Sequence, residues 1–362
     1  MTVMLELPPD DLTHPVTGAA IPHQIIAYQG VERYFVLISH SPSPLALVVL
    51  LHGFSSNATA VYSQWRTLVD ASDFAVLIPQ GMHGFDSNAR SWNAGVCCGF
   101  AKERNLDDVG LIRAMVASVW QTNPSLARLG RKAFVMGSSN GGFLAQLVAL
   151  NAEKAVDGFD FVAGAVSVAG EQFEAARYPA QSRRAVPVLM LHGQRDTVVR
   201  FTGCCNATGQ HCCCGIGAST TQCTSTPQVF DRWKALHACN LSTNADNWTA
   251  AQGGFTLSGS ECKATTRLGV FPGGTHSLIV SVPSVAAVVE DFLRAEACAQ
   301  LKNGGCSASS AANEEDAAAK VVVLALVVGV SLLLWCAVRW WRRAQVSWEL
   351  LPNPVNEVDL PE

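Results

Sequence analysis

The chain has 362 residues, of which 49% are hydrophobic and 15% are charged. These proportions exclude a mainly disordered protein, because so apolar a chain can bury a large core. The formal net charge is −4, and no stripe of lysine and arginine occurs in the first 300 residues. Nucleic acid is therefore not expected as the main partner, and small or neutral substrates fit better.

The cysteine content is high, with 13 in the chain. Twelve of them precede residue 320, an even number as disulfide pairing requires, and Cys336 stands apart. Four N-glycosylation sequons lie in the same region, at Asn57, Asn206, Asn240 and Asn247. Cysteines and sequons together place residues 1 to about 310 in an oxidising compartment, extracellular or lumenal.

An uncharged run, VVVLALVVGVSLLLWCAV, covers Val321–Val338 and would span about 27 Å as a helix, close to the hydrocarbon thickness of a bilayer. A buried core helix is the alternative. The flanks favour a membrane span, because Lys320 precedes the run and the sequence RWWRR, residues 339–343, follows it. Aromatic and basic residues at one end orient that end to the cytosol. We expect a single-pass membrane protein with a short disordered cytosolic tail over 339–362.

Residues 1–15 have neither the basic start nor the apolar run of a signal peptide. Two interpretations follow. Either the true start lies upstream, or the C-terminal helix is itself the targeting signal and the folded domain faces the cytosol. The second would leave the cysteines and sequons without a purpose, so we favour the first.

Apolar runs alternate with helical patterns through the first 300 residues, as in a mostly parallel sheet with crossover helices. Several of the strands are apolar throughout, which is expected when both faces are buried. The predicted strands are Arg33–Ile38, Leu45–Leu51, Phe74–Pro79, Arg131–Met136, Phe161–Val168, Val186–Leu191 and Thr266–Phe271. The predicted helices are Thr59–Ala71, Leu106–Thr122, Asn140–Asn151, Pro227–Ala238 and Val282–Cys298.

A segment over 201–265 interrupts this alternation with turn residues, sequons and eight cysteines. We expect an insertion that forms a disulfide-linked cap near the pocket. The cysteines around His211 also suggest zinc, but the Cys-x₂-Cys spacing of zinc modules is not cleanly present, so no metal is expected. Residues 301–320 are small, polar and low in complexity, which predicts a flexible stalk. The folded domain is thus predicted over 1–300.

The pentapeptide GSSNG, residues 137–141, follows a predicted strand and opens an apolar helix. Such a strand–turn–helix context is typical of a nucleophile elbow, in which small residues permit a tight turn and the serine projects at the start of the helix. A plain Gly-Ser turn is the alternative. The flanking elements favour the elbow, and Ser139 is the candidate nucleophile.

A serine hydroxyl needs a base, and the base needs an acid that orients it. After such an elbow these partners follow in the order acid, then histidine. His276 lies in a loop just after a predicted strand and is the candidate base. The other histidines after Ser139 are less suitable: His192 lies at a strand end, His211 in the cysteine cluster and His237 on a helix face. Asp196, in a loop at the end of the preceding strand, is the candidate acid.

An oxyanion hole requires two backbone N–H groups. Asn140, directly after the nucleophile, supplies the first, and Phe54, in the loop after the run LALVVL, is the expected second donor. His52 in the same loop is expected to be structural.

Trp92 and Asn93 are candidates for lining a substrate pocket, although a tryptophan at the end of a loop is as often simply packed. Cys97 and Cys98 are neighbours in the chain. Because a bond between adjacent residues is strained, we expect each of them to pair elsewhere.

The stretches LHGFSSNA, SWNAGVCCGF, DDVGLIRAM, GSSNGGFLAQ, LHGQRD and GGTHS resemble the polyhydroxybutyrate depolymerase and feruloyl esterase group of α/β-hydrolases. The resemblance spans roughly residues 30–300. It implies an α/β-hydrolase fold and hydrolysis, without metal or cofactor, of a phenolic ester on plant polysaccharide or of a polyester. The chain departs from the bacterial pattern in its Cys-rich segment, its sequons and its apolar C-terminal run.

Three functions remain open. The first is a carboxylic-ester hydrolase that works through an acyl-enzyme. The second is a catalytically silent hydrolase-fold ectodomain used for adhesion or signalling. The third is a serine peptidase on the same fold. Inactive relatives usually lack a member of the triad, and all three residues are present here, so the esterase is favoured.

Overall fold

The structure, a computed structural model of the whole chain, describes residues 20–301 and Cys306, apart from positions 72, 85–86, 96, 152–159, 171–184, 204–223, 247–253 and 283. The chain divides into two units, Met1–Asn303 and Gly304–Glu362. Every helix and strand of the described residues lies in the first unit.

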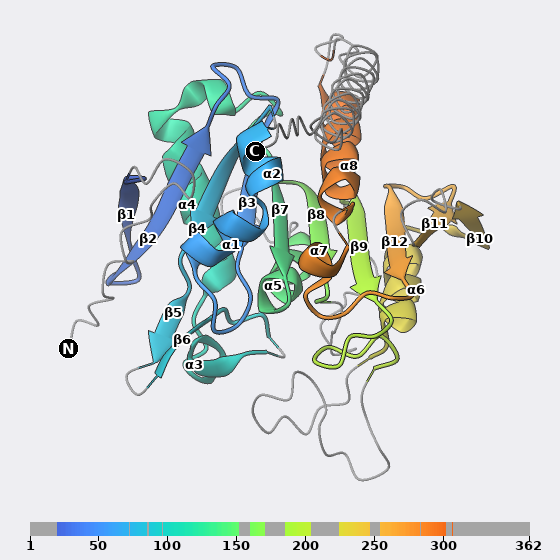
Figure 1. Cartoon of the computed structure of the whole chain (residues 1–362). Coiled ribbons are helices and arrows are strands. Elements are labelled where there is room, and N and C mark those ends of the chain that lie inside the picture. Colours follow the sequence, from blue (N-terminus) through green and yellow to red (C-terminus); the bar gives the residue numbers. More distant parts are fainter. Residues whose placement is uncertain are drawn as a thin grey trace, which may run out of the picture. The chain divides into compact units, whose positions relative to one another are not determined.

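A large sheet runs through this unit (Figure 1). The strands of the described residues are β1 (His23–Tyr28), β2 (Val31–Ser39), β3 (Ala46–Leu51), β4 (Phe74–Pro79), β5 (Met82–Gly84), β6 (Ser87–Ser91), β7 (Ala133–Ser138), β8 (Val162–Val168), β9 (Val188–Gly193), β10 (Asn240–Asp246), β11 (Phe255–Ser260) and β12 (Thr266–Phe271). Ten of them form the large sheet in the order β1-β2-β4-β3-β7-β8-β9-β12-β11-β10, and β5 pairs with β6.

The six central strands, from β4 to β12, run parallel to one another. Strands β1 and β2 at one edge and β11 and β10 at the other are antiparallel. Parallel strands in this order, with antiparallel β2 beside β4 and helices on both faces, make up the α/β-hydrolase fold. The structure confirms this part of the fold prediction.

Helices cover both faces of the sheet. They are α1 (Ala58–Gln64), α2 (Arg66–Ala71), α3 (Gly99–Glu103), α4 (Asp108–Thr122), α5 (Asn140–Leu150), α6 (Thr226–Leu236), α7 (Leu278–Ser281) and α8 (Val285–Gln300), with a 3₁₀ turn over Pro124–Leu126. Helices α1, α2 and α8 lie on one face, and α4, α5 and α6 lie on the other (Figure 1).

Continuous apolar runs form the centre of the sheet. Strands β3, β4, β8 and β9 are buried over their whole length, as their sequences predict. All seven predicted strands form, with ends within two residues of the prediction. Of the strands that were not predicted, β1, β10 and β11 lie toward the two edges of the large sheet, and β5 and β6 form a separate pair. Their sequences contain no long apolar run.

One predicted helix, Thr59–Ala71, is two helices in the structure. Helix α1 ends at Gln64, Trp65 is its C-cap residue, and α2 begins at Arg66. The indole of Trp65 is fully buried at this break. The other four predicted helices form as single helices, and a short additional helix, α7, precedes α8.

The segment 201–265 is not a separate cap where the structure describes it. Helix α6 begins with a capping box formed by Ser225 and Gln228, and it packs Phe230 and Trp233 into the main core. Strands β10 and β11 extend the sheet beyond β12. The cap prediction is therefore wrong for these parts, because an apolar helix face and strand pairing place them in the main domain. Residues 204–223, with six of the cysteines, lie outside the described residues.

No helix among the described residues is long and apolar enough to cross a membrane. The predicted stalk over 301–320, the predicted span Val321–Val338 and the predicted tail over 339–362 lie outside the described residues, except for Leu301 and Cys306.

Two of the buried histidines, His52 and His237, form hydrogen bonds within the fold. His52 is held by the carbonyl oxygen of Gly53, 2.7 Å from Nδ1, and its Nε2 accepts from the N–H of Gly81 at 2.9 Å. Burial lowers the pKa of His52 from 6.5 to about 4, although the bond to Gly53 opposes the change. Burial likewise lowers the pKa of His237 to about 4. The hydroxyl of Thr266 donates to the carbonyl oxygen of Ala264 at 3.0 Å, so Nδ1 of His237, 2.6 Å from the same hydroxyl oxygen, is the donor to it.

The protein should therefore lose stability as the pH falls from about 6.5 to about 4. Both histidines are neutral in the folded chain, so over this range the unfolded chain binds more protons than the folded chain. Proton binding lowers the free energy of the unfolded chain relative to that of the folded chain, and stability falls. His237→Asn keeps an N–H for Thr266 but cannot titrate, and should remove up to about 3 kcal/mol of the loss. Urea titrations across this pH range measure the effect. An equal loss in both proteins would contradict the assignment.

Candidate active site

Ser139 lies in the turn between β7 and α5, with φ 54° and ψ −123°. A positive φ is unusual for serine and marks a tight, strained turn. The N–H of Ser139 donates to the carbonyl oxygen of Val168 at 2.8 Å. A Cβ on Gly137 would lie 2.5 Å from the carbonyl carbon of Gly141, so the turn requires glycine at this position. The local geometry is that of the predicted elbow.

His276 and Asp196 lie in line with Ser139. Nε2 of His276 is 3.0 Å from Oγ of Ser139, and Nδ1 of His276 is 2.8 Å from Oδ2 of Asp196. A carboxylate can only accept, so Nδ1 carries the proton and Nε2 is free to accept from the serine hydroxyl. The structure thus brings together three residues that are far apart in the sequence.

The loops that carry the acid and the histidine are tied to each other. The N–H of Gln194 donates to the carbonyl oxygen of Phe271, and that of Arg195 donates to Gly274, both at 2.9 Å. A side chain on Gly193 would collide with the backbone of Gly274. These contacts fix the separation of Asp196 from His276.

Four donors surround the buried carboxylate of Asp196. Oδ1 accepts from the N–H groups of Val198 and Val199, each at 2.8 Å. Oδ2 accepts from His276 and lies 3.2 Å from Nε2 of His192. Burial raises the pKa of this carboxyl, but the bonds from His192 and His276 outweigh it and hold the pKa well below 3.8. Asp196 is therefore ionised at neutral pH.

His192 is a part of the site that its strand-end position did not reveal. Its Nε2 also lies 2.7 Å from the carbonyl oxygen of Val199, which can only accept, so Nε2 carries the proton. Its Nδ1 is 2.9 Å from the hydroxyl of Thr226 in α6. The spacing of four residues between His192 and Asp196 at a strand end was the available signal. The sequence argument excluded His192 as the base but did not identify it as a support for the acid.

A pocket of about 160 Å³ opens beside Ser139 and His276. Phe54 lines it, as do Val168 and the segment Leu278–Val280. The last segment begins two residues after His276, and its role was not predicted. Among the described residues, the backbone N–H groups of Phe54 and Asn140 donate to no protein acceptor. Phe54 lines the pocket, and Asn140 directly follows Ser139, so both remain candidates as oxyanion donors.

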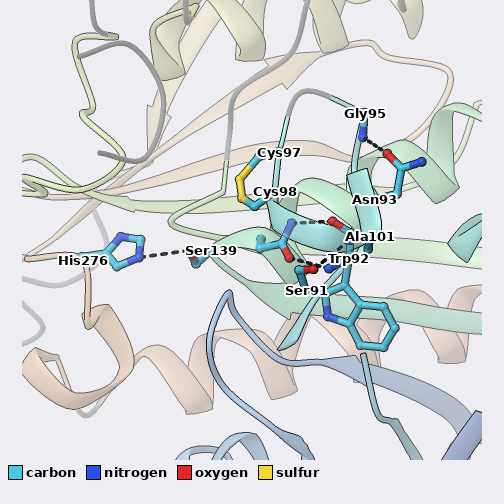
Figure 2. The surroundings of a disulfide bond; sticks show 10 residues. Ser91, Trp92, Asn93, Gly95, Cys97, Cys98, Ala101, Ser139 and His276 are labelled. Carbon is cyan, nitrogen blue, oxygen red and sulfur yellow. Dashed lines mark hydrogen bonds between the residues drawn. A yellow bond between two sulfur atoms is a disulfide. The ribbon is translucent and has the colours of Figure 1, made fainter. Parts of the chain in front are cut away.

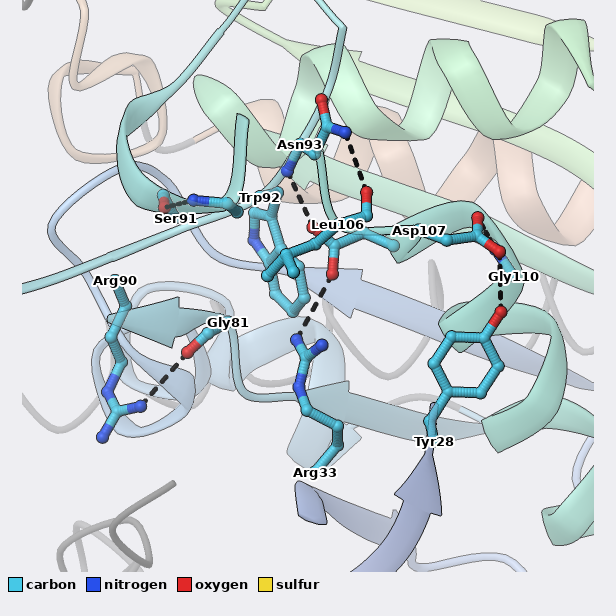
Figure 3. A network of polar contacts seen from close by, with 12 residues as sticks. Tyr28, Arg33, Gly81, Arg90, Ser91, Trp92, Asn93, Leu106, Asp107 and Gly110 are labelled. Carbon is cyan, nitrogen blue, oxygen red and sulfur yellow. Dashed lines mark hydrogen bonds and ion pairs between the residues drawn. The ribbon is translucent and has the colours of Figure 1, made fainter. Parts of the chain in front are cut away.

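Trp92 and Asn93, which were predicted to line a substrate pocket, do not line the pocket beside Ser139. Trp92 is fully buried, and its Nε1 donates to the carbonyl oxygen of His52 at 2.9 Å. Asn93 donates its N–H to Asp108 at 2.7 Å and its side-chain amide to Leu106 at 2.8 Å (Figure 3). Both residues are committed to the structure of the loop before α4, although the half-buried Asn93 also lines a separate cavity of about 360 Å³.

Cys97 and Cys98 form a disulfide with each other, contrary to the expectation that each pairs elsewhere (Figure 2). Both are buried in the core beside Trp92, where no other cysteine is available among the described residues. A second disulfide joins Cys239 to Cys262, near the edge strands β10 and β11.

Two of the four sequons lie in the described residues. Asn57 caps α1 by accepting from the N–H of Ala60 at 2.8 Å. Asn240 is exposed at the start of β10. Asn206, Asn247 and the cysteine cluster around His211 lie outside the described residues. Within the described part of the chain, no group of three or more His, Cys, Asp or Glu is arranged to hold a metal ion.

Comparisons with known proteins find similarity to serine hydrolases over part of the chain. A family model described as serine hydrolase (FSH1) matches residues 46–208, which include Ser139 and Asp196. Over this stretch the chain is similar to serine hydrolases. No match is found among curated protein sequences.

Several solved structures are similar to the chain at low sequence identity. The acetyl xylan esterase from Aspergillus awamori is 14% identical, with 70% of this chain and 94% of that chain covered and a TM-score of 0.46. Est1E from Butyrivibrio proteoclasticus is 14% identical, with 76% and 98% covered and a TM-score of 0.42. A serine hydrolase homologue from Coxiella burnetii is 13% identical, with 75% and 97% covered and a TM-score of 0.44.

Loss of the His192 donor should raise the pKa of Asp196 and slow the reaction of Ser139. His192→Leu removes one hydrogen bond to a buried charge, and about a tenfold to hundredfold lower rate of labelling by a fluorophosphonate probe is expected. His192→Gln can place an N–H near the same point and should restore most of the rate. If both variants fold and label like the original protein, His192 does not support the acid.

Proposed function

We propose that the chain is a serine carboxylic-ester hydrolase in which Ser139, His276 and Asp196 act as the catalytic triad. The observation that carries this proposal is the unbroken line of hydrogen bonds from Ser139 through His276 to Asp196, at 3.0 and 2.8 Å. This line ends at a pocket lined by Phe54. The backbone N–H groups of Phe54 and of Asn140, the residue after Ser139, donate to no acceptor among the described residues.

In the first half of the reaction, Oγ of Ser139 attacks the ester carbonyl carbon while Nε2 of His276 takes the hydroxyl proton. The carbonyl oxygen becomes negative, and the N–H groups of Phe54 and Asn140 stabilise it. The C–O bond then breaks, the alcohol leaves with the proton from His276, and the acyl group remains on Ser139.

In the second half, His276 takes a proton from water, and the resulting hydroxide attacks the acyl carbon. The bond to Oγ breaks, Ser139 regains its proton, and the acid is released. During both halves His276 carries a positive charge, and the ionised Asp196 at 2.8 Å stabilises it. Asp196 also holds the imidazole in the tautomer that leaves Nε2 facing the serine.

We infer that the acyl group is compact and apolar or aromatic. A pocket of about 160 Å³ is smaller than the roughly 300–1,000 Å³ of sites that enclose a drug-sized ligand, so the acyl group enters while the alcohol part stays outside. Phe54, Val168 and Leu278 supply apolar walls, and Val280 at the rim is 69% exposed. Feruloyl esters on a polysaccharide and hydroxyalkanoate polyesters, which the sequence resemblance implies, both place the bulky part outside.

Ser139→Ala should fold normally and lose nearly all esterase activity, leaving at most the roughly 10³–10⁴-fold rate over water that binding and the oxyanion hole supply. His276→Ala should be nearly as damaging, because the hydroxyl proton then has no acceptor. Asp196→Asn should retain more activity, since the base remains. Hydrolysis of p-nitrophenyl butyrate, with melting curves as a check on folding, measures all three. An active Ser139→Ala variant would overturn the mechanism.

The same preparations identify the substrate class. Methyl ferulate, hydroxybutyrate oligomers and a peptide amide are compared by kcat/KM, with Ser139→Ala as the blank. Preference for either ester over the amide supports the proposal. Cleavage of the peptide at a similar kcat/KM would instead indicate a serine peptidase, and no turnover of any substrate would indicate the silent ectodomain.

We also propose that the hydrolase domain faces the extracellular or lumenal side and that Val321–Val338 anchors it in a membrane. The support comes from the uncharged run with its basic flank and from disulfides such as Cys97–Cys98 and Cys239–Cys262, which suit an oxidising compartment. Exposed Asn240 is the most accessible described sequon.

Protein extracted from native membranes should migrate faster on a gel after treatment with peptide N-glycosidase. The Asn240→Gln variant should show a smaller mobility shift, by the mass of one glycan, because the acceptor nitrogen of Asn240 is removed. In sealed vesicles, an added protease should remove only the short tail when the cytosolic side faces outward. Digestion of the hydrolase domain from the cytosolic side, with no glycan shift, would rule out this orientation.

A further inference from the structure

The side-chain amide of Asn140 forms hydrogen bonds through both its oxygen and its nitrogen, whereas its backbone N–H donates to no acceptor among the described residues. Its Oδ1 accepts from the N–H of Trp92 at 2.8 Å, and its Nδ2 donates to the carbonyl oxygen of Trp92 at 3.1 Å. Both residues are fully buried. This two-point contact holds the first residue of α5 against the backbone of another loop, so the direction of the Asn140 N–H depends on where Trp92 lies.

The loop of the second oxyanion donor, Phe54, rests on the same stretch of chain. The N–H of Ser55 donates to the carbonyl oxygen of Arg90 at 2.8 Å. Nε1 of Trp92 donates to the carbonyl oxygen of His52 at 2.9 Å. Farther along, a Cβ on Gly99 would lie 2.6 Å from Cε2 of Phe54, so the backbone at Gly99 supports the phenyl ring directly.

We call Arg90–Gly95 and Cys97–Gly99 the bracing segment. Its two ends are joined through the carbonyl oxygen of Trp92, which accepts from the N–H of Cys98 at 3.1 Å as well as from Asn140. The carbonyl oxygen of Cys97 accepts from Ala94 at 2.8 Å. The Cys97–Cys98 disulfide lies in this turn, buried, with Ser139 and Trp92 nearby (Figure 2).

We propose that the bracing segment, closed by the Cys97–Cys98 disulfide, is a positioning element that fixes the oxyanion-binding N–H groups of Phe54 and Asn140 relative to each other. The inference rests on the proposed esterase function. The two donors come from different loops, after β3 and before α5, and the bracing segment contacts both. A shift of either donor by about 1 Å is enough to reduce turnover by about a hundredfold, so the brace acts on rate and not on substrate binding.

Two variants test the brace and one serves as a control. Asn140→Leu removes both bonds to Trp92 but keeps the backbone N–H. The double variant Cys97→Ala/Cys98→Ala opens the turn and leaves the triad untouched. The matched control, Cys239→Ala/Cys262→Ala, removes a disulfide at the far edge of the sheet. For each protein, kcat and KM for p-nitrophenyl butyrate and the affinity for phenylboronic acid are measured per active site, counted by saturating fluorophosphonate labelling.

Both brace variants should lose about tenfold to a hundredfold in kcat, less than the roughly 10²–10³-fold loss that follows removal of an oxyanion donor. Their KM should stay near the original, and phenylboronic acid, which mimics the tetrahedral intermediate, should bind more weakly by a similar factor. The control should melt at a lower temperature with unchanged kcat. If the brace variants keep both kcat and boronate affinity while Ser139→Ala is inactive, the brace is wrong and the esterase assignment stands.

Discussion

At the carboxyl end of β7, backbone segments approach so closely that no side chains fit between them. A Cβ on Gly141 would collide with the carbonyl oxygen of Leu51, and one on Gly170 would lie 2.5 Å from the carbonyl oxygen of Ser139. Strand β3, strand β7, the start of α5 and the chain after β8 all meet here. This close packing leaves Ser139 in a left-handed conformation at φ 54°, a strained position that persists because its surroundings determine it. The hydroxyl then projects away from the sheet, where partners can reach it.

The parallel sheet supplies those partners from strands farther along. Ser139 follows β7, Asp196 follows β9 and His276 follows β12, so all three leave the same edge of the sheet. The register pairs Phe271, the last residue of β12, with Gly193, the last residue of β9. The loops that follow these two strands therefore begin side by side at the carboxyl end of the sheet. Backbone bonds between these loops then hold His276 over the acid. Three residues that span 137 positions of sequence meet because strand order, and not sequence distance, determines their spacing.

Features encoded by local pattern could be predicted, and features decided by tertiary contact could not. Apolar runs such as ALVVLL identify buried strands, and the glycines of GSSNG identify the turn. Trp92 was assigned to the pocket because a tryptophan in a loop looks the same in sequence whether packed or exposed. Its bond to the His52 carbonyl, 40 residues away, decides the matter. The Cys97–Cys98 bond and the support from His192 likewise depend on neighbours that no local pattern shows.

A comparison of the two buried aspartates explains why the acid can serve His276. Asp108 accepts from Arg33 at 3.3 Å, a fixed positive charge, together with the N–H of Asn93. Asp196, in contrast, forms no ion pair with an arginine or lysine of the described residues, and backbone N–H groups and imidazoles hold its charge. An arginine at that point would cancel the negative potential at His276 and weaken its ability to become positive. Stabilising the carboxylate with dipolar donors keeps it ionised without neutralising it, so its charge stays available to the histidine beside Ser139.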